Sequence, residues 1–168
     1  GPQGGREQAT LAGPDVTPSI AYSPDGGWIA TASYDGKARL WNAATGRRIV
    51  TLSGGDSSSD IAFAPDGKTL ATAGFSGSPI LWDTASGKMR RILGGPKGWT
   101  GSVAFSPDGA RLATGLGGTD DGSGQVLLWE VDTGRLIDSF GELKQGDHPT
   151  VDLAFSRDGK MLGASNML

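Results

Sequence analysis

Two residue types that often carry out catalysis, cysteine and histidine, are absent or nearly absent from this 168-residue sequence. It contains no cysteine, so disulfides, thiolate nucleophiles and thiolate metal sites are excluded. The only histidine, His148, lies among Gly, Asp and Pro residues, and we expect a loop residue there rather than a general base. Asp120 and Asp121 are adjacent in a glycine-rich stretch that predicts no enclosure of the kind that separates the pKa values of a catalytic pair. The sequence therefore predicts that the chain is not an enzyme.

The same glycine-rich stretch, residues 117–125, lacks the patterns of the common ligand-binding loops. Gly117 and Gly118 are not followed by the Gly-Lys-Ser/Thr of a phosphate-binding loop. Carboxylates such as Asp120 and Asp121 suit Ca²⁺, but the alternating ligand spacing and the bidentate Glu of a calcium-binding loop are missing. We expect a solvated hairpin loop without a metal, and no cofactor for the chain.

The charge and hydropathy of the sequence bear on two further classes of partner, nucleic acids and membranes. The net charge is −3 and the isoelectric point is about 5.0, whereas a dedicated nucleic-acid binder usually carries a basic face. No apolar run approaches the roughly 20 residues that a membrane-spanning helix needs. We therefore expect neither a nucleic-acid nor a membrane partner.

The chain consists of repeats. The related strings AYSPDG, AFAPDG, AFSPDG and AFSRDG begin at Ala21, Ala62, Ala104 and Ala154, at intervals of 41, 42 and 50 residues. A second marker follows the first three strings, namely LWN, LWD and LWE, which contain Trp41, Trp82 and Trp129. Each repeat holds short apolar runs separated by tight turns, since Pro sets φ and Gly accepts a positive φ in Pro-Asp-Gly. Four short strands in about 40–45 residues are typical of one propeller blade.

The phased combination of Pro-Asp-Gly turn, LATA-type strand, LW marker and Thr-Gly or Ser-Gly turn resembles the WD-repeat β-propeller family. The resemblance covers residues 5–168 and implies an all-β fold of blades with four antiparallel strands. In this family a sequence repeat begins with the outer strand of one blade and continues into the three inner strands of the next. The implied repeats span residues 5–45, 46–86, 87–133 and 134–168.

Counted in that phase, the chain is an incomplete or open propeller of about 15 strands, beginning with an outer strand at residues 6–11. The last repeat lacks its third strand. We interpret the chain as about three and a half repeats of a larger propeller, whose open blade edges allow self-association.

The resemblance also implies roles for several repeat residues. WD repeats are similar to one another in a buried tetrad that joins a loop His, a Ser or Thr, an Asp and the repeat Trp. The first repeat offers Ser33, Asp35 and Trp41, with Pro14 in place of the His. No repeat carries the full tetrad, so we expect weak polar tethers between strands. Trp41, Trp82 and Trp129 are expected in the core because of their periodic strand position, and Asp35 and Ser33 as structural residues.

Binding is the function that the resemblance favours, through loops that share one rim. Three aromatic residues are expected at this rim, Tyr34, Phe75 and Trp99, and aromatic residues dominate interface hot spots. The rim loops also hold the acids Asp15, Asp35, Asp56, Asp60, Asp120, Asp121, Glu142 and Asp147, against Lys37, Lys97 and Lys144. The hypothesis is a non-catalytic protein-interaction scaffold whose acidic rim takes a basic peptide or protein, with Tyr34, Phe75, Trp99, Asp120 and Asp121 as candidate contacts.

Two alternatives stay open from the sequence alone. The chain fits the propeller segment of a larger multidomain enzyme or regulator, such as a kinase, NTPase or peptidase, whose chemistry lies outside these residues. It also fits a TolB-like propeller, a family that uses similar Ser-Pro-Asp-Gly turns, although the LW marker favours the WD family.

Overall fold

The computed structural model describes residues 10–11, 13, 15–55, 57–75, 78–96, 98–117, 124–143 and 150–166. All of the regular structure in these residues is β-strand, arranged in antiparallel sheets. None of them belongs to a helix that could cross a membrane.

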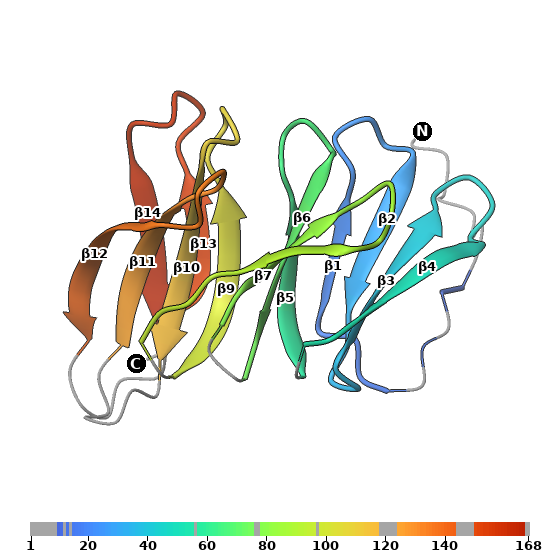
Figure 1. Ribbon diagram of the computed structural model, residues 1–168, viewed down its shortest axis with the longest axis horizontal. Coiled ribbons are helices and arrows are strands. Elements are labelled where there is room, and N and C mark those ends of the chain that lie inside the picture. Colours follow the sequence, from blue (N-terminus) through green and yellow to red (C-terminus); the bar gives the residue numbers. More distant parts are fainter. Residues whose placement is uncertain are drawn as a thin grey trace, which may run out of the picture.

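Three four-stranded sheets and one two-stranded sheet follow one another along the chain and lie side by side (Figure 1). Blade 1 contains β1 (Ser19–Tyr22), β2 (Trp28–Ala32), β3 (Lys37–Asn42) and β4 (Arg48–Ser53). Blade 2 contains β5 (Ser58–Phe63), β6 (Thr69–Gly74), β7 (Ile80–Asp83) and β8 (Met89–Ile92). Blade 3 contains β9 (Trp99–Phe105), β10 (Arg111–Gly117), β11 (Gly124–Glu130) and β12 (Leu136–Leu143). Half-blade 4 contains β13 (Thr150–Phe155) and β14 (Leu162–Asn166).

The strand order inside each blade is the order in the sequence, as expected for propeller blades. Fourteen strands are described, and the expected first strand at residues 6–11 lies almost entirely outside the described residues. The described sheets do not close into a ring, since β1 pairs only with β2 and β14 only with β13. The sequence-based prediction of an open, all-β propeller is therefore confirmed.

The Pro-Asp-Gly segments form the turns between the first two strands of each blade. In blade 1, Gly26 has a φ of 71°, a conformation that suits glycine. The carboxylate of Asp25 accepts hydrogen bonds from the Ser23 hydroxyl at 2.5 Å and from the Gly27 N–H at 3.0 Å. These bonds, of which the one from Ser23 has the largest effect, lower the pKa of Asp25. In blade 3 the corresponding bond from Ser106 lowers the pKa of Asp108. The repeated motif thus fixes the same hairpin geometry in successive blades.

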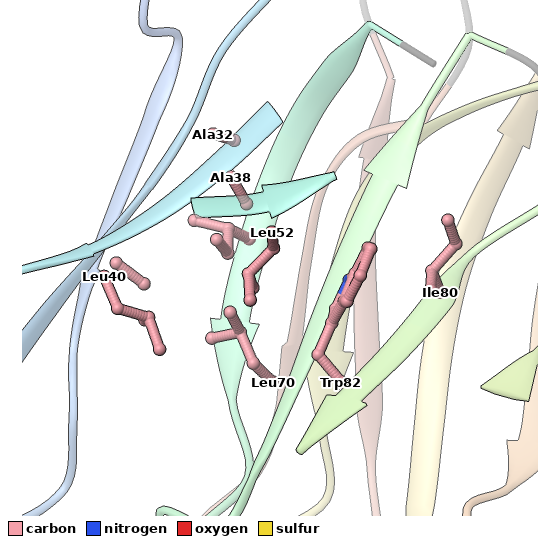
Figure 2. Packing of buried hydrophobic residues seen from close by; sticks show 9 residues of the cluster. Ala32, Ala38, Leu40, Leu52, Leu70, Ile80 and Trp82 are labelled. Atoms are coloured by element: carbon pink, nitrogen blue, oxygen red, sulfur yellow. The ribbon is translucent and has the colours of Figure 1, made fainter. Parts of the chain in front are cut away.

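Apolar layers hold neighbouring blades together. Between blades 1 and 2, Trp82 packs with Leu40, Leu52 and Leu70 (Figure 2). Between blades 2 and 3, Trp129 takes the corresponding place in a cluster that also contains Leu93 and Leu112. Each of these two tryptophans therefore faces the preceding blade and fills the space between two sheets.

The hydrogen-bond partners of the repeat tryptophans correct the expected tetrad. The Trp41 indole N–H donates to the hydroxyl of Thr31 at 3.0 Å, not to Ser33. Trp82 and Trp129 donate in the same way to Thr72 and Thr114, at 3.0 and 2.9 Å. The reason is register: Ile29 is opposite Trp41 on the neighbouring strand, so Thr31 lies diagonally from the indole, whereas Ser33 lies beyond the end of β2. All three blades carry this bond, which joins the second and third strands of each blade.

Candidate functional site

Three aromatic side chains from three different blades form one row. The rings of Tyr34 and Phe75 meet edge to face, with centroids 5.8 Å apart and planes at 64°. Phe75 stacks on Trp99 with a centroid distance of 5.5 Å and planes only 8° apart. These are the three residues that the sequence analysis placed at one rim, and the structure brings them into contact.

Strand register explains how three blades supply one row. Tyr34 and Phe75 each follow the second strand of their blade, and their N–H groups donate to the carbonyls of Val16 and Ser57, at 3.1 and 3.2 Å. In blade 3 that same position is Gly117, and its partner across the sheet is Trp99. The third ring therefore comes from the innermost strand, where Gly117 leaves space above it.

Gly98 supports the placement of Trp99. Its φ of 155° is rare for residues with a side chain, and a Cβ at this position would lie 2.6 Å from the Gly117 carbonyl oxygen. The same Cβ would lie 3.0 Å from Leu116 Cδ1. Only glycine allows the chain to approach β10 this closely immediately before the tryptophan.

The row is accessible to a partner. Tyr34 is 41 % exposed and Phe75 is 50 % exposed, while Trp99 is half-buried beside them. Pairs of aromatic rings in such geometries contribute about 0.5–1.5 kcal/mol beyond their burial, so the rings fix one another in position. An exposed aromatic surface whose side chains are already ordered loses little entropy on binding.

Serine residues under the row connect the blades. The Ser57 hydroxyl donates to the Tyr34 carbonyl at 2.7 Å, and the Ser58 N–H donates to the Ser33 carbonyl at 3.0 Å, joining blade 2 to blade 1. The Ser59 hydroxyl donates to the Thr100 carbonyl at 2.8 Å, joining blade 2 to blade 3. These bonds set the positions of the blades directly beneath the aromatic rings.

Asp60, which was expected as a free rim acid, instead joins three blades. Its carboxylate accepts from the Ser19 hydroxyl of blade 1 at 2.6 Å and from the Val103 N–H of blade 3 at 2.9 Å. It also accepts from the N–H of Ile61, its neighbour on β5, at 2.8 Å. Burial raises the pKa of Asp60 above its usual range, although these hydrogen bonds act in the opposite direction. Sequence analysis missed this role because contacts between blades leave no local signal.

Asp35 is also engaged within the protein. The guanidinium of the buried Arg39 donates to both of its carboxylate oxygens, and the Lys37 N–H donates at 3.1 Å. The hydrogen bond from Arg39 is the main reason why the pKa of Asp35 is lowered. Asp35 thus holds the turn after β2 and neutralises a buried cation, rather than adding a free charge to the rim.

The remaining candidates divide into two groups. Asp15 is exposed, and its carboxylate accepts from the Val16 N–H at 2.7 Å. The predicted contacts Asp120 and Asp121 lie outside the described residues, as do Asp56, Lys97, Lys144, Asp147 and His148. The acidity of the rim therefore stays a prediction from the sequence.

A second concave surface lies beside half-blade 4. An apolar groove of about 470 Å³ is lined by Val126, Leu128 and Phe140 of blade 3 and by Phe155 and Leu162 of the half-blade. The equivalent positions in blade 1 are Ala38, Leu40 and Leu52, which are covered by Trp82 of blade 2. The groove therefore occupies the position that the repeat tryptophan of the next blade fills between blades 1 and 2.

The described residues bring together no catalytic constellation, and they contain no cluster of three or more His, Asp or Glu that could hold a metal ion. The expectation that the chain is not an enzyme stays a prediction.

Comparisons with known proteins agree on the architecture. A family model described as "WD domain, G-beta repeat" matches residues 5–42, 46–83 and 87–130. The comparison with curated proteins returns no match. Among solved structures 1143 chains match, so this architecture alone does not single out a function.

One of these matching structures is "Kuenenia stuttgartiensis Hydrazine Synthase". The two chains superpose with a TM-score of 0.79 at 21 % sequence identity, over 88 % of this chain and 43 % of that one. This chain thus spans less than half the length of its neighbour, and similarity at that identity shows the fold alone.

Proposed function

Because the chain belongs to the WD40 repeat family, whose domains generally bind proteins or peptides, we propose that it is a non-catalytic interaction module. Its binding surface is the aromatic row of Tyr34, Phe75 and Trp99. The observation that carries the proposal is that three blades bring these rings into one contiguous row while leaving two of them partly exposed. Partly exposed, ordered aromatic residues are the usual anchors of protein interfaces.

The partner that best suits this surface is a basic peptide segment. Asp35 and Asp60 are engaged within the protein, and Glu142, expected in a loop, belongs to strand β12. The sequence still assigns Asp15, Asp56, Asp120, Asp121 and Asp147 to loops of this rim. Lys37, Lys97 and Lys144 are the cations assigned there. A basic segment would gain from this excess of acids, mainly in association rate and specificity, while the aromatic row supplies most of the affinity.

An array of short synthetic peptides graded in net charge tests the proposal directly. Labelled protein should bind basic peptides more strongly than neutral or acidic peptides of matched hydropathy. Phe75→Ala should weaken binding to the best peptide at least about tenfold, which corresponds to about 1.4 kcal/mol and is modest for a hot-spot residue.

Phe140→Ala is the matched control, since Phe140 is 45 % exposed but lies on β12 of blade 3 and is not part of the row. Circular dichroism would verify that both variants fold. If no peptide binds, or if the two variants weaken binding equally, the aromatic row is not the binding surface.

A further inference from the structure

The innermost strands of successive blades contact one another in a repeated way. A branched side chain on the inner strand of one blade packs on small residues of the preceding blade. Ile61 clusters with Ala30 and Ala32 of blade 1, and Val103 clusters with Ala71 and Ala73 of blade 2. Ile61 is 3 % exposed and Val103 is 6 % exposed, so the fit is close.

A carboxylate adds a directional bond to this contact. Asp60 of blade 2 accepts the N–H of Val103, the residue of blade 3 whose side chain packs on Ala71 and Ala73. The contact between the inner strands of blades 2 and 3 therefore has two sides. Blade 3 supplies a branched residue and its N–H, and blade 2 supplies an Asp and a surface of small residues, which we call the seat.

Half-blade 4 presents the second half of this contact to solvent. Asp152 holds the position of Asp60 on β13, and its carboxylate accepts the Leu153 N–H at 2.9 Å, as Asp60 does with Ile61. Asp152 is exposed, and so are Ala154, Gly163 and Ser165, which hold the positions of Ala62, Ala71 and Ala73. This is an intact seat that no described residue covers.

The buried hydroxyl of Ser102 is a second observation that concerns the same surface of half-blade 4. Ser102 is 2 % exposed, and its hydroxyl has no hydrogen-bond partner among the described residues. Its counterpart in blade 1, Ser19, donates to Asp60, a carboxylate that blade 3 holds from the other side. For Asp152, the equivalent acceptor for Ser102, no described residue takes the part that Val103 of blade 3 plays for Asp60.

Blade 1 presents the first half of the contact. Ile20 holds the position of Ile61 and Val103, and its register opposite Thr31 matches that of Val103 opposite Thr114. That register directs the Ile20 N–H away from β2. The Ile20 side chain is 60 % exposed, although its counterparts in the later blades are nearly inaccessible.

We propose that blade 1 of a second copy of this chain docks on half-blade 4, with Ile20 seated on Ala154, Gly163 and Ser165 and its N–H donated to Asp152. The two surfaces are different, so the contact is head to tail. Two copies then form a ring through two identical contacts. Each copy contributes three four-stranded blades and one half-blade, and the resulting eight sheets, two of them half-blades, lie within the four to eight positions with which propellers close.

Multi-angle light scattering on the 168-residue chain across a concentration series tests this pairing. The expected mass is twice the chain mass of 17.2 kDa. Asp152→Ala should raise the dimer dissociation constant by about tenfold for each of the two contacts, or about a hundredfold in all. Ile20→Lys should abolish the dimer, because a charged side chain cannot enter the apolar seat.

Matched controls exist for both changes. Asp138 is exposed on β12, and its carboxylate likewise accepts the N–H of the next residue, at 2.8 Å, so Asp138→Ala should leave the dimer intact. Ile49 is 47 % exposed on the outer strand β4, so Ile49→Lys should do the same. A monomeric wild-type chain would overturn the proposal, as would a dimer that resists both Ile20→Lys and Asp152→Ala.

Mixing the two variants tests the head-to-tail arrangement. The Ile20→Lys copy retains its Asp152 surface, and the Asp152→Ala copy retains its Ile20 surface. The labelled Ile20→Lys variant, which is monomeric alone, should therefore enter a dimer through one intact contact when the Asp152→Ala variant is added in excess. A labelled Ile20→Lys variant that stays monomeric even with excess wild-type chain would refute the head-to-tail contact, because the wild-type chain still offers the Ile20 surface that this variant needs.

Discussion

Thr114→Val should destabilise the protein although it removes no volume from the core. Thr114 and Trp129 both have an exposed fraction of 0 %, and the indole N–H has the threonine hydroxyl as its acceptor at 2.9 Å. Valine has nearly the same shape but no acceptor, so the variant keeps the packing and leaves a buried donor unpaired. A lost hydrogen bond contributes about 0.5–1.5 kcal/mol, and an orphaned buried donor costs about 1–3 kcal/mol. We expect a loss of about 2 kcal/mol in the free energy of unfolding.

Urea unfolding followed by tryptophan fluorescence measures this loss, and a thermal scan should show a midpoint lower by about 4–8 °C. Thr51→Val is the control, since Thr51 lies on the outer strand β4 and does not contact a tryptophan indole by hydrogen bond. Adding Trp129→Phe completes a double-mutant cycle, because phenylalanine lacks the donor. Thr114→Val should cost much less in that background. A loss below about 0.5 kcal/mol, or the same loss with and without Trp129, would refute the reasoning.

Three further predictions concern contacts between blades. Asp60→Ala should lower the free energy of unfolding by about 2–3 kcal/mol, because it leaves hydroxyl and N–H donors from three blades without their acceptor, whereas Asp138→Ala should have little effect in the same urea titration. Because the folded pKa of Asp60 lies above 3.8, the stability that Asp60 contributes is greatest below that pH and falls as the pH rises through the folded pKa. Asp60→Asn should remove this dependence of the free energy of unfolding on pH. An unchanged dependence would contradict the assignment. Gly95→Ala should lower the free energy of unfolding by about 1–3 kcal/mol, since the added Cβ would lie 2.7 Å from Trp129 Cη2. Gly94→Ala is the control, because a Cβ at Gly94 would have no heavy atom within 4 Å. Equal unfolding midpoints for the two variants would contradict this packing.

The residues of the rim could be predicted because the repeats of this chain can be aligned with one another. Superposing the repeats of one chain put Tyr34 and Phe75 in the same position and placed Trp99 in the neighbouring loop. Their mutual contact did not follow from that comparison, since it depends on the rotation between blades. The structure supplied this rotation, and with it the two ring distances.

Other features could not be predicted, for physical reasons that differ between residues. The Thr partners of the tryptophans were present in every repeat, but the expected acceptor was sought two residues later, at Ser33. Asp60 was assigned to the rim loops, whereas the structure places it on strand β5. Its bonds to Ser19 and Val103 join residues that lie 41 and 43 positions away, so no local pattern reports them.

The two layers of contact between blades have different consequences for binding. The apolar layer around Trp82 and Trp129 lies between sheets and mainly determines stability. The polar layer of Ser57, Ser59 and Asp60 adds little apolar burial, but it joins blades 1, 2 and 3 directly under the aromatic row. Since the row depends on the relative positions of three blades, loosening the polar layer would separate the rings before the blades unfold. If the aromatic row binds as proposed, its specificity therefore depends on hydrogen bonds that lie beneath the rings and not on the surface that a partner would touch.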